Sequence, residues 1–301
     1  MIFIALIVTF NRLEKLKLCV NASLEAGFNH LVIVNNASTD GTGEWLQSVS
    51  SQNIHIVTLP NNSGGAGGFK SGAEYINDHL SADWVAMYDD DAYPSKDLLK
   101  KFIAKDRSSF TAYSCKVIDT YGNECLMNKP FTKVPYSFFE NVEYFFRPSE
   151  YVPKEDESTS CITLSFVGTI IKSEILSDYR NFIHENLFIY FDDVYFSLHL
   201  SNEGHNFFYC PELLFTHDVS IKSDVVLPTW KVYYLSRNLL LSRHFLKSCP
   251  PYSWSAILLR LVKLGFNVYK QKSKKSYFNY LISGISDGLK GVTGSKHYGK
   301  K

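Results

Sequence analysis

The 301-residue sequence contains no Cys-x-x-Cys pair, no His-x-His or His-Glu-x-x-His spacing, and no internal repeat or low-complexity stretch. Its six cysteines are scattered singly along the chain. This scatter argues against a disulfide framework and against a cysteine-based zinc site, and it fits a reducing, cytoplasmic compartment.

The sequence also lacks a hydrophobic run long enough to cross a membrane, which takes about 20 residues. The apolar start, residues 1–10, has no basic segment before it and no small-residue cleavage site, and it runs directly into Asn11-Arg12. These features disfavour a signal peptide. We therefore expect a buried strand at the start of the chain.

Acidic residues are almost missing from the end of the chain. Residues 260–301 carry ten Lys and Arg against one acid, Asp287, which leaves 21 basic and 29 acidic residues before that point. The net charge of +1 therefore combines an acidic body with a basic C-terminal stretch. Because the basic residues cluster only there and form no recognised motif, we expect no nucleic-acid partner.

The first hundred residues alternate between strand-like and helix-like patterns. Strand-like runs at residues 3–9, 31–35, 54–59 and 84–88 alternate with helical spacing at residues 13–26, 42–49 and 68–80. Such alternation predicts βαβ units and a parallel sheet, which is a Rossmann-like α/β domain. With 45% of its residues hydrophobic, the chain can bury a large core.

Beyond residue 101 the pattern loosens. Residues 131–160 are typical of irregular excursions over a site, and residues 161–171 of a strand. We expect the α/β domain to occupy residues 1–228. A helical, basic region is expected at residues 229–301.

Polar clusters follow the four predicted strands. Ligands of parallel sheets bind beyond the carboxyl ends of the strands, so these clusters are expected to lie at one edge. They comprise residues 9–12, 35–40, 61–68 and 89–91.

Three successive carboxylates, Asp89, Asp90 and Asp91, follow the fourth strand. Adjacent carboxylates repel one another and need a counter-charge, which a divalent cation bridging to a diphosphate would supply. In an extended chain residues i and i+2 point the same way, so we expect Asp89 and Asp91 to face one site. The alternative is a solvated acidic turn or a helix N-terminus without a metal.

The glycine-rich residues 61–68 open a predicted helix. Gly64 and Gly65 would let the backbone approach phosphate or sugar oxygens, although a tight loop without a ligand fits equally well. After the second strand, Asp40 is placed to accept from a ribose hydroxyl or a base NH, or else to cap a helix.

Asp192 and Asp193 follow the apolar residues 188–191. Apolar surroundings raise the proton affinity of a carboxylate and suit it to act as a general base, while the pair also fits the start of a helix. His217 is a candidate metal ligand, although a lone histidine is more often structural.

Together these segments resemble family 2 glycosyltransferases of the GT-A fold, over about residues 2–245. The matching residues are Val8-Thr9-Phe10-Asn11-Arg12, residues 35–42 and Asp89-Asp90-Asp91. A narrower resemblance is to galactofuranosyltransferases and their rhamnosyltransferase-like relatives. It rests on Asn62 with residues 64–69, on Phe191-Asp192-Asp193, and on Tyr233-Tyr234-x-x-Arg237-Asn238.

The resemblance implies a GT-A domain with a mixed central sheet and a C-terminal helical extension, and an inverting enzyme that uses a UDP- or dTDP-sugar. It assigns Mn²⁺ or Mg²⁺ to Asp89, Asp91 and His217, and deprotonation of the acceptor hydroxyl to Asp193. The nucleotide-sugar site would be formed by Thr9, Arg12, Asp40, Asn62, Gly64, Gly65, Asp89 and Asp90. The best-matching reaction transfers galactofuranose from UDP-galactofuranose to a glycan or lipid-linked oligosaccharide in bacterial cell-surface polysaccharide synthesis.

The sequence departs from polymerising galactofuranosyltransferases in three ways. It lacks their large flanking domains and a Trp-Trp pair, and Tyr195 stands where many relatives carry an acid. We therefore expect single addition. Rhamnosyl or hexopyranosyl transfer is the alternative on the same fold. A catalytically inactive sugar-nucleotide-binding scaffold is the alternative of another class, and the intact acidic motif, Asp193 and His217 argue against it.

The basic C-terminal stretch is also rich in apolar residues between positions 254 and 289. This combination predicts an amphipathic helical hairpin that binds the anionic inner face of the cytoplasmic membrane, where a lipid-linked acceptor would be found. The alternative is a hairpin whose apolar face packs on the α/β domain or on a second subunit.

Overall fold

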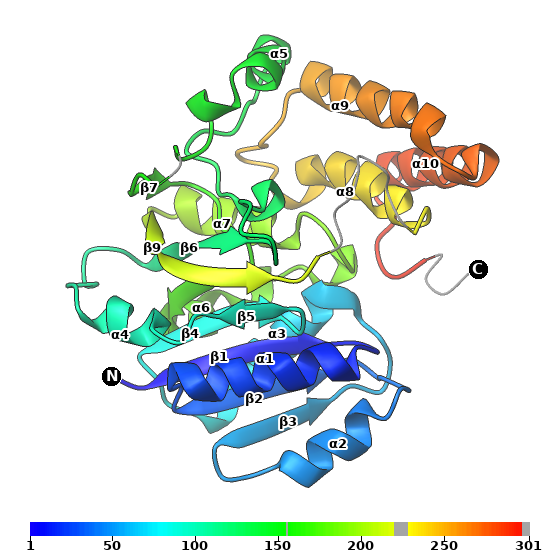
Figure 1. Ribbon diagram of the computed structural model, residues 1–301. Coiled ribbons are helices and arrows are strands. Elements are labelled where there is room, and N and C mark those ends of the chain that lie inside the picture. The colour runs from blue at the N-terminus through cyan, green and yellow to red at the C-terminus, as the bar shows by residue number, and fades with distance from the viewer. Residues whose placement is uncertain (155, 220–227, 297–301) are drawn as a thin grey trace.

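The computed structural model describes residues 1–154, 156–219 and 228–296 (Figure 1). In chain order its elements are β1 (Phe3–Thr9), α1 (Leu13–Ala26), β2 (His30–Asn35), α2 (Thr42–Val49), β3 (Ile54–Thr58), α3 (Gly64–His79), β4 (Trp84–Asp89), β5 (Ala92–Pro94), α4 (Leu98–Ile103), β6 (Ala112–Ile118), η1 (Leu126–Asn128), α5 (Phe138–Phe146), η2 (Pro148–Glu150), β7 (Thr159–Cys161), β8 (Thr169–Lys172), α6 (Ser173–Tyr179), η3 (Arg180–Phe182), η4 (Glu185–Leu187), α7 (Asp192–Asn202), β9 (Phe207–His217), α8 (Lys231–Phe245), α9 (Trp254–Phe266), η5 (Asn267–Lys270) and α10 (Lys274–Leu289).

Nine strands of the described chain form one sheet, in the order β3-β2-β1-β4-β8-β6-β9-β5, with β7 beside β9. β1 pairs in parallel with β2 and β4, and β2 pairs in parallel with β3. β8 is antiparallel to β4 and β6, whereas β6 and β9 are parallel. The predicted α/β class with a mixed central sheet is therefore confirmed.

Both faces of the sheet are covered by helices. In β1, Ala5 and Ile7 face a core shared with α1, α2 and α4, while Leu6 and Val8 face a core shared with α3, α6 and α7. This alternation follows from the two-residue period of a strand. Figure 1 shows α1 on the near face and α3 behind the sheet.

Helix α3 begins at Gly64, so the predicted start at residue 68 is wrong. A Cβ atom at Gly68 would lie 2.5 Å from Val8 Cγ1, and one at Gly72 would lie 2.1 Å from Leu6 Cδ1. Glycine inside a helix costs about 1 kcal/mol relative to alanine. The glycines are therefore explained by close packing of α3 on β1, and most of the segment is helix instead of loop.

Two further segments differ from the sequence-based expectation. Residues 161–171 do not form one strand, because β7 ends at Cys161 and β8 begins at Thr169. Residues 131–160 contain a helix, α5, whose start is fixed by a capping box between Ser137 and Glu140.

The C-terminal residues form the predicted helical hairpin, α9 and α10, and it packs on the rest of the chain through α8. Tyr277 and Leu281 of α10 contact Val232 of α8, and Ile257 of α9 contacts Leu240. No described helix has the length and apolar character needed to span a membrane. Lys300 and Lys301 of the basic stretch lie outside the described residues. The division at residue 228 stays a prediction.

Candidate active site

The acidic run lies where β4 ends and the chain turns into β5. Asp89 closes β4, and the register of β5 against β9 sets Ala92 opposite His217. The backbone N–H of Asp218 donates to the carbonyl of Asp91 at 2.8 Å. Strand pairing therefore carries His217 to the acidic run from more than a hundred residues away in the sequence.

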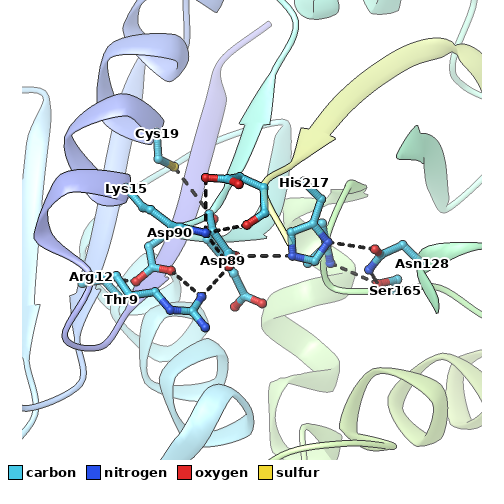
Figure 2. A network of polar contacts seen from close by, with 12 residues as sticks. Thr9, Arg12, Lys15, Cys19, Asp89, Asp90, Asn128, Ser165 and His217 are labelled. Carbon is cyan, nitrogen blue, oxygen red and sulfur yellow. Dashed lines mark hydrogen bonds and ion pairs between the residues drawn. The ribbon is translucent and has the colours of Figure 1, made fainter. Parts of the chain in front are cut away.

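Asp90 is turned toward the end of β1. Its Oδ2 accepts from the Thr9 hydroxyl at 2.8 Å and from the Phe10 N–H at 3.2 Å (Figure 2). Arg12 Nη1 lies 3.2 Å from Asp90 Oδ1 and 2.5 Å from Asp91 Oδ2. Arg12 thus supplies the counter-charge for two of the three carboxylates, and the Thr9 hydroxyl stabilises Asp90 by a hydrogen bond.

The three carboxylates differ in proton affinity. Burial, together with Asp91 and Asp90 as like-charged neighbours, raises the pKa of Asp89 to about 7. Burial raises the pKa of Asp90 to about 6, against the opposing charge of Arg12. Burial also opposes ionisation of Asp91, but the His217 imidazole in its protonated form, together with Arg12, holds the pKa of Asp91 below the ordinary value. Asp89 is therefore the carboxylate with the least compensated charge.

His217 is held by Asn128, a residue that the sequence did not single out. His217 Nδ1 lies 3.0 Å from Asn128 Oδ1, and Asn128 Nδ2 donates to Ser165 Oγ at 2.9 Å (Figure 2). With Asn128 Oδ1 as acceptor, the proton of a neutral imidazole lies on Nδ1, which leaves a lone pair on Nε2. That lone pair faces Asp91 Oδ1 at 3.3 Å.

The residues of this site fit a divalent cation. Asp91 Oδ1 is buried and has no hydrogen-bond donor in the described part of the chain, and its lone pairs face the one on His217 Nε2. Carboxylate oxygens and an imidazole nitrogen are suitable ligands for Mn²⁺. No three His, Cys, Asp or Glu side chains of the described residues are grouped closely enough to hold a metal alone. Diphosphate oxygens of a donor would complete the ligand set, as they do for Mg²⁺ in many sites.

The start of α3 forms a tight turn beside the loop before α7. Asn62 Oδ1 accepts from the Gly64 N–H at 2.8 Å, and the Ala66 N–H donates to the carbonyl of Phe188 at 3.2 Å. A Cβ atom at Gly64 would lie 2.0 Å from that carbonyl oxygen, whereas one at Gly65 would meet nothing within 4 Å. Gly64 is therefore required by packing, and Gly65 faces open space.

A second asparagine to which the sequence analysis gave no role, Asn36, supports the turn at the start of α3. Asn36, buried after β2, donates from Nδ2 to the Gly64 carbonyl and accepts at Oδ1 from the Ser63 N–H, both at 2.8 Å. Asn36 was included in the family motif but received no role. The structure joins the second and third polar clusters through it.

Asp40 is exposed, and its carboxylate bonds to the first residue of α1 and to the first residue of α2. Its Oδ2 accepts from the Leu13 N–H at 3.0 Å, and its Oδ1 accepts from the Thr42 hydroxyl at 2.6 Å. Thr42 is the first residue of α2, but the N-cap residue of this helix is Gly41 and not Asp40, so the expected N-cap role of Asp40 is wrong. Asp40 holds the start of α2 from one residue before the N-cap. Asp40 also lines a surface depression of about 440 Å³ with residues 11–15, which include Arg12.

Asp192 and Asp193 form the first turn of α7. Asp193 Oδ1 accepts from the Val194 N–H at 2.7 Å. Burial raises the pKa of Asp193 to about 6. Burial and the charge of Asp193 raise the pKa of Asp192 well above its ordinary value, and Asp89 contributes in the same direction. The charges of Asp89 and Asp192 are therefore close enough to interact.

The loop before this pair has an uncommon backbone. Phe188, Tyr190 and Phe191 have φ of 70°, 67° and 68°, which is unfavourable for bulky residues. Asn238 on α8 holds the loop by donating from Nδ2 to the carbonyls of Leu187, Ile189 and Tyr190 at 3.1, 2.8 and 3.0 Å.

Arg237 reinforces the same loop. Its side chain is fully buried, and Nη2 donates to the Leu187 carbonyl at 2.8 Å while Nη1 donates to the Gly294 carbonyl at 2.5 Å. Arg237 and Asn238 were part of the motif that matched the family branch. The structure gives the motif a physical role, which is to fix the backbone that carries Asp193.

A further cation, Lys231 at the start of α8, was not expected from the sequence. Burial lowers its pKa and so does the nearby charge of Arg12, while Asp89 and Asp91 act in the opposite direction. Lys231 is therefore close enough to Asp89 and Asp91 for their charges to interact.

Residues 4–169 match the model of the family described as Glycosyl transferase family 2. The chain belongs to this family. This glycosyltransferase is similar to the low-salt glycan biosynthesis hexosyltransferase Agl10 of Haloferax volcanii. The two sequences are 20% identical over 277 residues, which cover 89% of this chain and 85% of that protein. Its fold is similar to that of S. aureus TarS 1–349, with a TM-score of 0.58, 15% identity, and coverage of 97% of this chain and 81% of that chain. The predicted family and GT-A fold are confirmed, while the galactofuranosyl branch stays a prediction.

Proposed function

We propose that this glycosyltransferase is an inverting, metal-dependent enzyme that moves a hexose from a nucleotide sugar to a hydroxyl of a glycan acceptor. The observation that carries the proposal is the buried Asp91 Oδ1, which has no hydrogen-bond donor among the described residues and lies 3.3 Å from His217 Nε2. This pair lies beside Asp89, whose charge is poorly compensated, at the carboxyl ends of the parallel strands.

The donor would lie across the ends of β1, β2 and β4. Arg12 and Asp40 line the same depression and are placed to meet the base and ribose, with Thr9 orienting Asp90 from below. Asn62 and the backbone N–H groups at the start of α3 would face the diphosphate, since a helix N-terminus favours anions. Gly65 leaves space for that approach.

Asp89, Asp91 and His217 would hold Mn²⁺ or Mg²⁺, which offsets negative charge on a departing diphosphate. Lys231 adds a positive charge near Asp89 and Asp91. In this proposal the leaving group therefore meets both a bound metal and fixed cations.

Asp193 acts as the general base in this proposal. A pKa of about 6 leaves it ionised at neutral pH and basic enough to take a proton. Its carboxylate accepts the acceptor's hydroxyl proton while the acceptor oxygen bonds to the anomeric carbon. The bond from that carbon to the diphosphate breaks, and the nucleoside diphosphate leaves with the electron pair. One displacement inverts the anomeric configuration.

We favour UDP-galactofuranose over a dTDP-sugar as the donor, because the motifs around Asn62, Asp193 and Asn238 resemble the galactofuranosyltransferase branch. Hexopyranosyl transfer is the second candidate, since the Haloferax relative is named a hexosyltransferase. A lipid-linked oligosaccharide is the proposed acceptor, and the inner face of the cell membrane is the proposed location.

Nucleotide release with matched variants tests the proposal. The purified enzyme is incubated with candidate nucleotide sugars, a glycan acceptor extract and Mn²⁺ or EDTA. We expect metal-dependent release of UDP, and binding of UDP in Mn²⁺ that survives in Asp193→Asn while transfer falls by about 10²–10⁴-fold. Near-normal turnover of Asp193→Asn would remove Asp193 as the base. Donor binding without any turnover in the wild type would favour the inactive scaffold.

A further inference from the structure

Helix α9 has one apolar face that packs on the protein and a second that does not. Ala256 and Ile257 are buried against α8. Leu258 and Phe266 lie on the other face and are 62% and 68% exposed. Trp254 and Val262 continue this stripe at four-residue spacing, so it runs along the whole helix.

Helix α5 adds aromatic side chains to the same end of the molecule. Phe139, Phe145 and Phe146 are 81%, 66% and 75% exposed. The two helices are joined by a hydrogen bond of 2.8 Å from Arg260 Nε to Asn141 Oδ1, and the Lys263 ammonium lies 5.5 Å from the centre of the Phe145 ring. Figure 1 shows α5 beside α9 at the end of the molecule opposite α2.

We call this region the aromatic surface. It consists of Phe139, Phe145 and Phe146 of α5 and Trp254, Leu258, Val262 and Phe266 of α9. These side chains, far apart in sequence, gather at one end of the molecule only in the fold. Exposed apolar patches that exceed scattered single residues mark sites of interaction with proteins or membranes.

The charges along the α9–α10 hairpin have one sign up to Ser286. No acid occurs between Trp254 and Ser286, and the first one after them, Asp287, is bonded to Tyr233 and Lys296. The two acids of α5 are engaged as well, because Glu140 pairs with Lys133 and Glu143 accepts from Tyr151. Exposed lysines surround the hairpin at positions 263, 270, 272, 274 and 275.

We propose that the aromatic surface inserts into the interfacial layer of an anionic membrane, with the lysines of η5 and α10 on its headgroups. Aromatic rings suit this layer, and lysines complement its charge. The proposal deepens the membrane location proposed above by naming the surface that makes the contact. Because α9 packs on α8, and α8 holds the loop of Asp193, the candidate site would lie one helix layer from the lipid.

Flotation of the full chain with vesicles tests this surface. Vesicles of phosphatidylcholine containing about 30% phosphatidylglycerol are compared with vesicles of pure phosphatidylcholine. Each is tested at about 50 mM and at about 500 mM salt, because the Debye length is severalfold shorter at the higher concentration. We expect binding to the anionic vesicles that weakens at high salt, and a shift of Trp254 emission to shorter wavelength. No binding to anionic vesicles at low salt would overturn the proposal.

Two variants with matched controls assign the contact. Leu258→Ser with Phe266→Ser should lower vesicle partitioning by about tenfold or more, because both side chains lose apolar burial in the membrane. Leu18→Ser, similarly exposed on α1, should leave partitioning unchanged. Replacing Lys270, Lys272, Lys274 and Lys275 by Gln should weaken binding, whereas the same change of Lys96, Lys100, Lys101 and Lys105 near α4 should leave it intact.

Two outcomes separate this inference from its alternatives. A concentration-dependent dimer that Leu258→Ser with Phe266→Ser dissolves, without vesicle binding, would make the surface a contact between two copies and overturn the membrane proposal. UDP release with a water-soluble acceptor and no vesicles should be equal in the wild type and this variant. Failure of vesicle binding therefore leaves the proposed transfer reaction intact, and failure of transfer leaves the surface intact.

Discussion

The side-chain amide of Asn238 donates to the carbonyl of Ile189 at 2.8 Å, across the interface between α8 and the loop that carries Asp193. It is a contact between a helix in the C-terminal region and the candidate catalytic base. It makes the position of Asp193 depend on a residue that never touches substrate in the proposed mechanism.

We expect Asn238→Ala to lower kcat by about 100-fold with little change in donor KM, because a small displacement of a reacting group costs that much. The carbonyls of Ile189 and Tyr190 would lose this donor, at about 1–3 kcal/mol in stability, while the Leu187 carbonyl would keep its hydrogen bond from Arg237. Steady-state kinetics well below the Tm measure both parameters. Ser236→Ala on the same helix is the control, since its hydroxyl bonds to carbonyls of α8 and α10 and not to the loop. Equal kcat in both variants would limit Asn238 to folding.

The rate of transfer should rise with pH as Asp193 loses its proton. Burial raises the pKa of Asp193 to about 6, so its carboxylate form is present above that pH and lost below it. We expect log kcat/KM to rise with a slope near one below about pH 6 and to level off above. UDP binding measured over the same range separates this effect from donor affinity. A rate independent of pH between 5 and 8 would contradict the base assignment.

The stability of the fold should depend on the same proton in the opposite sense. Burial raises the pKa of Asp193, so the folded state holds a proton that the unfolded state releases, and stability falls as pH rises from about 4 through about 6. Asp193→Asn removes the ionisation. We therefore expect it to raise the Tm more at pH 8 than at pH 5, measured by calorimetry. A larger gain at pH 5 would show that burial is not the cause.

Gly64 and Gly65 should respond differently to alanine. A Cβ at Gly64 would lie 2.0 Å from the Phe188 carbonyl, and Gly64 has a φ of 75°, so Gly64→Ala should destabilise the fold strongly. Gly65→Ala meets no atom within 4 Å and lies in α3, so it should keep or raise the wild-type Tm. If the donor approaches this turn, Gly65→Ala weakens UDP-sugar binding in a thermal-shift titration. Unchanged binding would remove Gly65 from the donor site.

Asp91→Ala and His217→Ala should both abolish the part of UDP binding that depends on Mn²⁺, because each removes one of two facing ligands. Titration calorimetry with and without EDTA measures this part. Asp97→Ala, an exposed acid paired with Lys101, is the control. If Asp91→Ala binds UDP in Mn²⁺ as the wild type does, the metal role of Asp91 is wrong.

The first half of the fold could be predicted from the sequence because its strands and helices are marked by local patterns of apolar residues. Four apolar strands and the spacing of α1 and α2 gave the parallel part of the sheet. The start of α3 was misjudged because glycine has low helix propensity, and the demand for glycine at Gly68 and Gly72 comes from Val8 and Leu6 across the sheet. The break between β7 and β8 is likewise set by pairing with different partners, β9 and β4.

The candidate site was predictable where a residue's own chemistry marks it, as for Asp91 and Asp193. Asn128 and Lys231 carry no such mark, since one belongs to a short 3-10 turn and the other begins a helix. Their proximity to His217 and Asp89 arises from contacts between distant segments. Motif matching reached Arg237 and Asn238, but only the structure supplied the reason for their presence.

The main-chain carbonyl and N–H of Gly294 bond to Arg237, which supports the loop before Asp193, and to Asn186, which begins that loop. Its carbonyl accepts from Arg237 at 2.5 Å, and its N–H donates to the Asn186 carbonyl at 2.7 Å. A ribosome makes the chain from its N-terminus, so Asp193 exists for the synthesis of about a hundred residues before Gly294 does. An unfinished chain therefore carries the acid without its last brace. In the proposed mechanism, catalytic competence therefore waits for the last residues of the chain, whereas the strands of the parallel sheet are all made within its first third.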